Sequence, residues 1–166
     1  MITKVALKTP LRYPGGKSRA VKKMAQFFPD FSHYTEFREP FLGGGSVSLY
    51  ISQVYPDLDI WVNDLYEPLY CFWKILQVSG DKLSKELTEL KSRYPDRSSA
   101  RGLFVEAKEY LEKKPKECDP FHRAVAFYVV NKCSFSGLSE SSSFSPQASD
   151  SNFSMRGIER LKYYSQ

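Results

Sequence analysis

Apolar side chains follow two kinds of spacing over residues 1–79, and each kind predicts a different element. Segments 19–28, 46–54 and 68–77 carry them at helical intervals. Segments 34–37 and 59–63 are short runs rich in β-branched and aromatic residues, which predict strands. Helices that alternate with short strands are typical of an α/β sheet, so we expect that fold class.

The pattern changes after Gly80. Segments 82–94 and 100–113 are charged and amphipathic at helical spacing, and the more apolar segment 120–131 predicts a further helix. Because no clear strand separates these helices, we expect a helical insertion in the α/β domain.

The last part of the chain combines a polar stretch with a short helix. Segment 134–154 is rich in serine and predicts a loop or weak hairpin, whereas 155–164 predicts a helix. We therefore expect the α/β part over 1–79, the insertion with its serine-rich loop over 80–154, and a return helix over 155–166.

The segment between the first strand and the second helix is the most informative for chemistry. It reads Glu39-Pro40-Phe41-Leu42-Gly43-Gly44-Gly45-Ser46, and Asp64 ends the next strand. Glycines let backbone N–H groups and a helix start approach a ligand, and a carboxylate at this spacing can bind ribose hydroxyls. A dinucleotide or adenosyl pocket is therefore predicted. The alternatives are an ordinary connecting loop and an Asp64 that caps the following helix.

A second glycine segment, Tyr13-Pro14-Gly15-Gly16-Lys17, imitates the end of a phosphate-binding loop. A P-loop carries a further glycine at the position that Leu11 occupies here, and no strand precedes this segment closely. The sequence therefore argues against a nucleotide triphosphatase.

Charge and cysteine content narrow the class of protein. The net charge is +5, and seven basic residues precede the first acid, Asp30, which favours polyanionic partners unless they form only a solvated face. The three cysteines are far apart and the two histidines are isolated, so we expect no metal site. No apolar run is long enough to span a membrane, and a cytoplasmic location is expected, with a transit peptide as the alternative.

In this order, four segments resemble the Dam-type DNA adenine methyltransferases: 11–17, 36–46, 119–125 and 131–138. The resemblance implies a Rossmann-like, S-adenosylmethionine-dependent methyltransferase sheet with a helical target-recognition insertion. It also implies methyl transfer to the exocyclic amine of adenine in double-stranded DNA, as in restriction–modification systems. The target adenine must leave the base stack to be methylated.

The resemblance assigns a cofactor site to residues of both glycine segments. Tyr13 is expected to stack near the cofactor, Lys17 to meet its carboxylate or a backbone carbonyl, and Phe41 to pack on its adenine or methionine arm. The full set is Tyr13, Gly15, Gly16, Lys17, Glu39, Pro40, Phe41, Gly43, Gly45 and Asp64.

The resemblance places DNA contacts on Lys132, Phe135, Ser136 and Leu138, with Phe135 as an aromatic wedge between bases. The alternative is that Phe135 is a core residue and Lys132 ends a helix. Glu140 stands where Dam carries a base-reading arginine. Since glutamate cannot donate to guanine, we expect a target other than GATC.

The catalytic motif of the family, Asp-Pro-Pro-Tyr, does not occur in residues 1–166, so no catalytic residue is assigned. Asp119-Pro120-Phe121 does not replace it, since Asp119 as a helix N-cap and Pro120 at the first helical position explain that segment. We expect a truncated enzyme with an exposed apolar sheet edge, which a complementary chain carrying the catalytic half would complete.

Two other functions are compatible with the residues. A non-catalytic DNA-binding module could retain a vestigial cofactor pocket. A dinucleotide-dependent oxidoreductase is disfavoured because Ser48 stands where the turn would need its third glycine.

Overall fold

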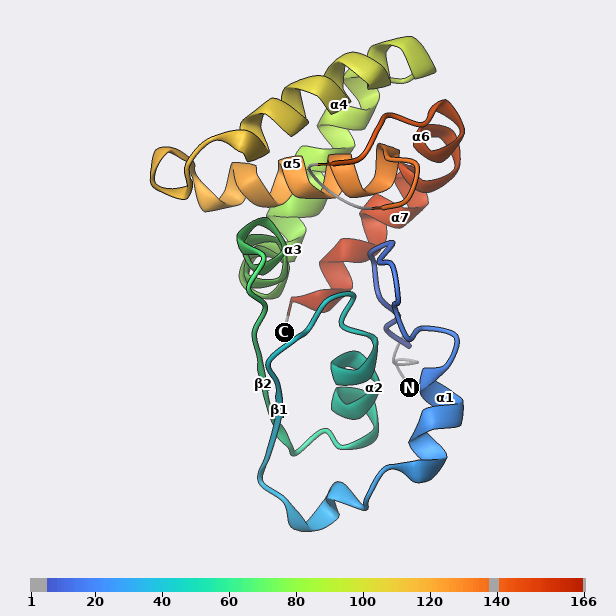
Figure 1. Ribbon diagram of the computed structural model, residues 1–166, viewed down its shortest axis with the longest axis vertical. Coiled ribbons are helices and arrows are strands. Elements are labelled where there is room, and N and C mark those ends of the chain that lie inside the picture. Colours follow the sequence, from blue (N-terminus) through green and yellow to red (C-terminus); the bar gives the residue numbers. More distant parts are fainter. Residues whose placement is uncertain (1–5, 138–140, 166) are drawn as a thin grey trace.

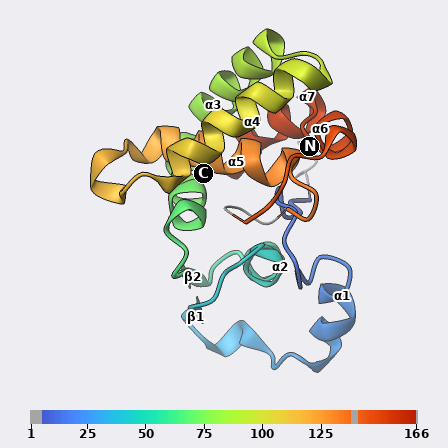
Figure 2. The ribbon, with the colours of Figure 1, turned by 45° about the horizontal axis from the view of Figure 1, so that its top comes forward.

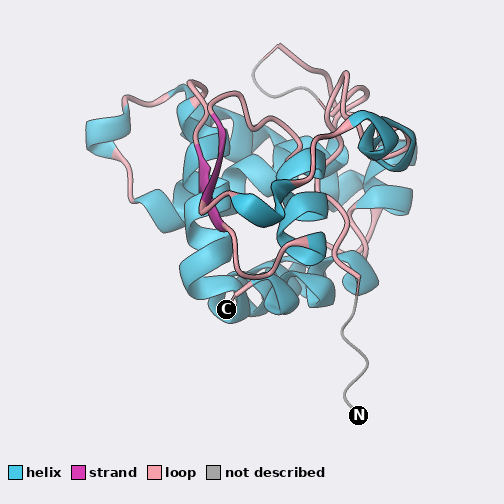
Figure 3. Cartoon of the chain, turned by 90° about the horizontal axis from the view of Figure 1, so that it is seen from below, coloured by secondary structure: helices cyan, strands magenta, loops and turns pink. Residues whose placement is uncertain are grey.

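The computed structural model describes residues 6–137 and 141–165. A helical part lies above a small two-stranded sheet in Figure 1. The strands β1 (Glu36–Glu39) and β2 (Asp59–Val62) pair in parallel and lie side by side in Figure 3. Helix α2 (Ser46–Val54) connects them, as a parallel pair requires a crossover. The mixed α/β architecture predicted from the sequence is confirmed.

The register of the sheet separates a covered face from an exposed one. Phe37 pairs with Ile60 and Glu39 with Val62, and all four residues are half-buried. The alternate positions are exposed, and among them Trp61 keeps 49% of its surface accessible. Strand β1 begins and ends two residues later than predicted, because its pairing with β2 runs from Glu36 to Glu39.

The segment before β1 is less regular than the predicted helix over 19–28. It forms one turn of α-helix, α1 (Val21–Met24), and a 3₁₀ turn over Ala25–Phe27. A second 3₁₀ turn follows at Phe31–His33, and the Phe31 ring lies 5.7 Å from that of Phe37 and 5.5 Å from that of Tyr55, centroid to centroid. This aromatic cluster fixes the N-terminal segment beside β1.

Three helices form most of the hydrophobic core. Helices α3 (Glu67–Arg93) and α4 (Arg97–Glu112) pack against α5 (Pro120–Cys133), as Figure 2 shows. Most residues of α5 are buried. Asp119 accepts a hydrogen bond from the His122 N–H, and Pro120 occupies the first helical position. The structural explanation of the Asp-Pro-Phe segment is therefore confirmed.

Helix α3 consists of two helical parts that the sequence predicts separately, and the break between them is confirmed. It kinks at Ser79, where φ is −150° and ψ is 36°. At the kink the Ser165 hydroxyl accepts from the Gly80 N–H at 2.6 Å and donates to the Leu76 carbonyl at 3.0 Å. A side chain inserted into the helical hydrogen-bond ladder is a known cause of kinks.

The serine-rich segment is only partly a loop. Residues 133–137 and 141–145 are the two described sides of a hairpin-like turn, with a bridge between Ser134 and Phe144. Helix α6 (Pro146–Asn152) follows, so the prediction of a loop as far as residue 154 was wrong. The Ser145 hydroxyl caps α6 by accepting from the Ala148 N–H at 3.1 Å. Helix α7 (Met155–Glu159) and a 3₁₀ turn (Arg160–Tyr164) end the described chain.

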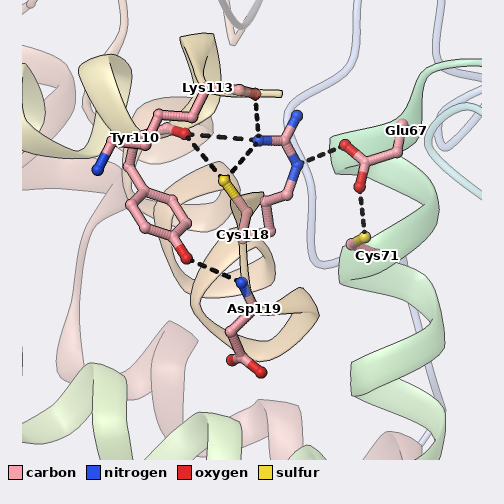
Figure 4. A network of polar contacts seen from close by, with 7 residues as sticks. Glu67, Cys71, Tyr110, Lys113, Cys118 and Asp119 are labelled. Atoms are coloured by element: carbon pink, nitrogen blue, oxygen red, sulfur yellow. Dashed lines mark hydrogen bonds and ion pairs between the residues drawn. The ribbon is translucent and has the colours of Figure 1, made fainter. Parts of the chain in front are cut away.

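A polar network ties the start of α3 to the connection between α4 and α5 (Figure 4). The Arg123 guanidinium donates to Glu67 and, at 3.1 Å, to the Lys113 carbonyl. The Cys118 sulfur lies 3.5 Å from the same guanidinium, and the Cys71 thiol lies 3.0 Å from the Glu67 carboxylate. This network fixes the direction in which α3 leaves the sheet.

Candidate functional site

The glycine turn between β1 and α2 needs glycine for its backbone. Gly43 and Gly45 have φ values of +51° and +68°, a region that residues with side chains rarely adopt. The Leu42 N–H donates to the Asn63 carbonyl at 2.9 Å, so the turn extends the pairing of the two strands. Its backbone therefore lies at the carboxyl end of the sheet, where α/β proteins bind ligands.

Two aromatic rings of the same chain hold the turn between them. A Cβ atom on Gly43 would lie 2.9 Å from the Tyr13 ring, and one on Gly45 would lie 2.6 Å from the Trp73 ring. The Trp73 indole N–H also donates to the Gly43 carbonyl at 3.0 Å. Tyr13 thus meets the turn. Trp73 was predicted only as part of a helix, and its contact with the turn depends on tertiary structure.

Asp64 contacts the turn through its carboxylate. One oxygen accepts from the Gly43 N–H at 2.8 Å and the other from the Tyr66 N–H at 3.1 Å. The second bond closes a turn just before α3, whose N-cap residue is Tyr66 and not Asp64, so the alternative that Asp64 caps the following helix was wrong. A carboxylate has about four acceptor sites, which leaves room to accept from two ribose hydroxyls.

Glu39 faces α2. Its carboxylate accepts from the Ser48 N–H at 3.2 Å and from the Ser48 hydroxyl, in the first turn of the helix. Burial raises the pKa of Glu39 above its ordinary value, and the two bonds from Ser48 act in the opposite direction. A carboxylate at a helix N-terminus is stabilising, so Glu39 anchors α2 to β1.

Two large apolar side chains are exposed just beyond the strands. Phe41 follows β1 and is 84% exposed, and Leu65 follows β2 and is 95% exposed. Pro40 is also exposed.

A pocket of about 570 Å³ opens between α2, β2 and α3, and Gly45 and Asp64 are among the residues that line it. The volume lies in the range of small-molecule sites.

The N-terminal glycine segment is exposed. Gly15 has a φ of +72°, and the Gly16 N–H donates to the Tyr13 carbonyl at 2.9 Å, which closes a tight turn. The Lys17 ammonium donates to the Gly15 carbonyl in the same loop. The structure thus brings Tyr13 to the glycine turn and leaves Lys17 at the surface.

The hairpin-like turn exposes an aromatic ring. The Phe135 N–H donates to the Ser143 carbonyl at 3.0 Å, while the side chain of Phe135 is 78% exposed. The alternative that Phe135 is a core residue was therefore wrong. Ser136 is exposed as well, and the predicted contact Leu138, like Glu140, lies outside the described residues.

Lys132 lies at the base of this turn, in the last turn of α5. Its ammonium lies 5.3 Å from the centroid of the Tyr128 ring, and the residue is half-buried. Burial, and to a smaller extent the charge of Arg12, lower the pKa of Lys132 to about 8. The Lys132 side chain therefore contacts the core residue Tyr128, while its backbone lies next to the exposed turn.

The described ranges contain neither a metal-binding cluster nor a helix that could span a membrane. Within residues 6–137 and 141–165, no three His, Cys, Asp or Glu side chains gather in a way that could hold a metal ion. In the same ranges, none of the helices has the length and apolar character needed to cross a membrane.

The glycine turn and the Asp64 carboxylate lie together at the carboxyl end of a small parallel sheet, the place where open α/β sheets bind their ligands. The chain belongs to the D12 class N6 adenine-specific DNA methyltransferases, whose family model matches residues 13–162. It is similar to the Type II methyltransferase M.MjaIII of Methanocaldococcus jannaschii, with 26% identity over 133 residues. That match covers 77% of this chain and 46% of the relative, so the chain spans less than half of the relative's length.

Proposed function

We propose that this chain forms the cofactor-binding and DNA-contacting portion of an N6 adenine DNA methyltransferase with a Rossmann-like fold. The observation that carries the proposal is the hydrogen bond between the Asp64 carboxylate and the Gly43 N–H, which joins the turn and the acid at one end of the sheet. Family membership supports the type of reaction.

The proposed cofactor is S-adenosylmethionine, which supplies an electrophilic methyl group. Asp64 has free acceptor capacity for the ribose hydroxyls. The exposed Phe41 ring offers an apolar surface for the adenosyl group, and the exposed Lys17 ammonium offers a cation for the carboxylate. The donor and acceptor groups of these residues therefore fit the chemistry of the cofactor, although the rings of Tyr13 and Trp73 lie against the turn itself.

The proposed partner is double-stranded DNA. The exposed Phe135 ring is suited to wedge between bases while the target adenine is out of the stack. Ser136 offers a hydroxyl beside it, and Lys132 a cation at its base. The sequence-based assignment of Leu138 to this surface stays a prediction.

We assign catalysis to residues outside this chain. No Asp-Pro-Pro-Tyr occurs in its 166 residues, and the methyltransferase relative is more than twice as long as the matched region. A complementary chain or segment would supply the groups that accept hydrogen bonds from the adenine amine. The two-stranded sheet has an unpaired edge on each strand among the described residues, which is where additional strands would pair.

Calorimetry with S-adenosylhomocysteine tests the cofactor site. Wild-type chain is expected to bind, and Asp64→Ala to bind about tenfold more weakly or worse, since a charge-assisted hydrogen bond contributes about 1.5–3 kcal/mol. Asp57→Ala is the matched control, because Asp57 is an exposed acid in the turn before β2. Equal affinity of the two variants, or no binding by the wild type, would contradict the cofactor proposal.

A second candidate is a DNA-binding module with a vestigial pocket. The observation that favours it is that Tyr13 and Trp73 already fill both sides of the glycine turn. This candidate predicts DNA binding that weakens steeply with salt and no heat on addition of S-adenosylhomocysteine. The same titration therefore separates the two functions.

A further inference from the structure

The side chain of Asn131 holds the backbone of the N-terminal segment. Its carbonyl oxygen accepts from the Arg12 N–H at 3.0 Å, and its amide nitrogen donates to the Arg12 carbonyl at 2.6 Å. The same nitrogen donates to the Gly137 carbonyl at 2.8 Å. Asn131 is 1% exposed, so these bonds form in a water-excluded site. The buried amide of Asn131 thus links Arg12, 119 positions away in the sequence, to Gly137 in the exposed turn.

The Arg12 guanidinium also binds the backbone of the exposed turn. It donates to the Ser134 carbonyl at 2.6 Å and to the Phe135 carbonyl at 2.9 Å. Hydrogen bonds from a charged donor are shorter and stronger than neutral ones, and two from one planar group fix an orientation. The backbone that carries the exposed Phe135 ring is therefore positioned by Arg12.

Gly137 brings the two segments into close backbone contact. Its φ is +74°, and a Cβ atom there would lie 2.7 Å from both the Cβ atom and the carbonyl oxygen of Arg12. Its own N–H donates to the Ser134 hydroxyl at 3.0 Å. The exposed turn cannot shift at Gly137 without moving Arg12 or breaking these contacts.

Arg12 is next in sequence to Tyr13, whose ring lies on the glycine turn. A continuous series of contacts therefore runs from Gly43 through Tyr13, Arg12 and Asn131 to the backbone of Phe135. A ligand on the turn would press on Tyr13 at one end of this series, and DNA would contact Phe135 at the other.

We propose that Arg12 and Asn131 are positioning residues that couple cofactor binding at the glycine turn to the order of the DNA-facing turn over 134–137. The inference rests on the proposed function for the identity of the two ligands. Coupling of binding free energies is reciprocal, so DNA on Phe135 favours cofactor binding by the same factor by which cofactor favours DNA.

Hydrogen exchange detected by mass spectrometry tests the coupling in the whole chain, with S-adenosylhomocysteine as the probe. In wild type, the ligand is expected to slow exchange of the Phe135 and Gly137 amides, although neither residue belongs to the proposed cofactor site. In Arg12→Met this protection is lost while the heat of ligand binding remains. Arg101→Met, which removes an exposed arginine on α4, keeps the protection.

Arg12→Lys gives a second variant if Arg12→Met fails to fold. A single ammonium is a point charge and does not reproduce the two fixed donors of a guanidinium, so protection is expected to fall there too. A purely structural role predicts a lower melting temperature with unchanged ligand-dependent protection, which overturns the inference. Ligand binding in wild type without any change at residues 135–137 also overturns it and leaves the proposed function intact. No ligand binding at all counts against the proposed function itself.

Discussion

Arg123 is 4% exposed, an extreme value for a charged side chain, and its only carboxylate contact among the described residues is Glu67. Removal of one partner of a buried pair leaves the other charge without compensation. We therefore expect Glu67→Ala to lower the free energy of unfolding by about 3 kcal/mol, since Glu67 itself is partly exposed. Urea denaturation at constant m-value measures the change.

The control for this substitution is the ion pair between Arg97 and Asp150, whose side chains are 65% and 45% exposed. Asp150→Ala is expected to cost less than about 1 kcal/mol, as surface pairs do. A Glu67→Ala variant that loses no more stability than Asp150→Ala would show that the buried network is dispensable.

Lys132 gives a prediction for pH. Its lowered folded-state pKa, about 8, means that the folded chain gives up this proton before the unfolded chain does. The unfolded state thus binds more protons between about pH 8 and the ordinary lysine pKa of about 10.4, so this group makes stability rise with pH in that window. Below about pH 8, the charged and largely buried Lys132 ammonium destabilises the folded state, and Lys132→Met removes this destabilisation.

We accordingly expect Lys132→Met to be more stable than wild type near pH 7, by an amount on the order of 2 kcal/mol. The difference should shrink as the pH rises through about 8 to 10. Paired urea titrations of both proteins measure it, and effects of other groups such as Cys133 cancel in the difference. A stability difference that does not depend on pH would contradict the assigned environment of Lys132.

Individual site residues differ in how far the sequence could predict them. The meeting of Gly43 and Asp64 follows from strand–turn–helix order, because parallel strands bring their carboxyl ends together. The role of Glu39 as an anchor of α2 does not, since a carboxylate before a glycine turn can face either the ligand or the helix. Trp73, predicted only as a helix residue, and Asn131, the first residue of the segment 131–138, received no site role because both make their decisive contacts with distant segments.

Helix α3 shows how one glycine shapes an element. Gly80→Ala would place a Cβ atom against the Ser165 hydroxyl and 2.8 Å from the Leu161 carbonyl. We expect a loss of about 1–3 kcal/mol, since insertion into a packed site forces shifts of backbone. Gly102→Ala, in the interior of α4 with open space around it, is the matched opposite case and should gain about 0.5–1 kcal/mol.

Thermal melts of the two variants, followed by circular dichroism, measure the contrast. Equal shifts in the melting temperature would mean that the kink at Ser79 contributes nothing to the packing of the C-terminal turn.

The limits of element prediction have physical causes. The boundaries of α2 and of the start of α5 were correct because local signals, a glycine turn and an Asp-Pro cap, set them. The two predicted helices on either side of Gly80 are present as the two parts of α3, because the Ser79 backbone is non-helical and the Ser165 hydroxyl bonds backbone groups at the break. The start of α6 carried a Ser145-Pro146 cap signal, which the surrounding serine-rich composition obscured.

Across the whole molecule, the hydrophobic core and the candidate cofactor turn are separated. Among the described residues, the main core cluster is built from α3, α4, α5 and the C-terminal segment, and it includes no residue of β1, α2 or β2. The glycine turn next to the small sheet contacts the rest of the chain through the Trp73 ring of α3 and the Tyr13 ring of the N-terminal segment.

The proposal that this chain binds cofactor and DNA while another chain or segment supplies the catalytic groups gives a prediction for methyl transfer. We expect the 166-residue chain alone to transfer no labelled methyl group from S-adenosylmethionine to DNA, since it lacks Asp-Pro-Pro-Tyr. Addition of a chain that carries this motif and the sheet strands around it should restore transfer to adenine. Transfer to protein or RNA but never to DNA adenine would contradict the proposed substrate.

The two rings that enclose the glycine turn change how genetic data on this protein should be interpreted. Any larger residue at Gly43 or Gly45 would collide with Tyr13 or Trp73 before a cofactor arrived. A survey of tolerated substitutions would record both positions as invariant even in a protein that had lost its ligand. The Phe41 ring makes little contact with the rest of the chain. A restriction on the residues tolerated at position 41 would therefore indicate binding of the adenosyl group and not packing.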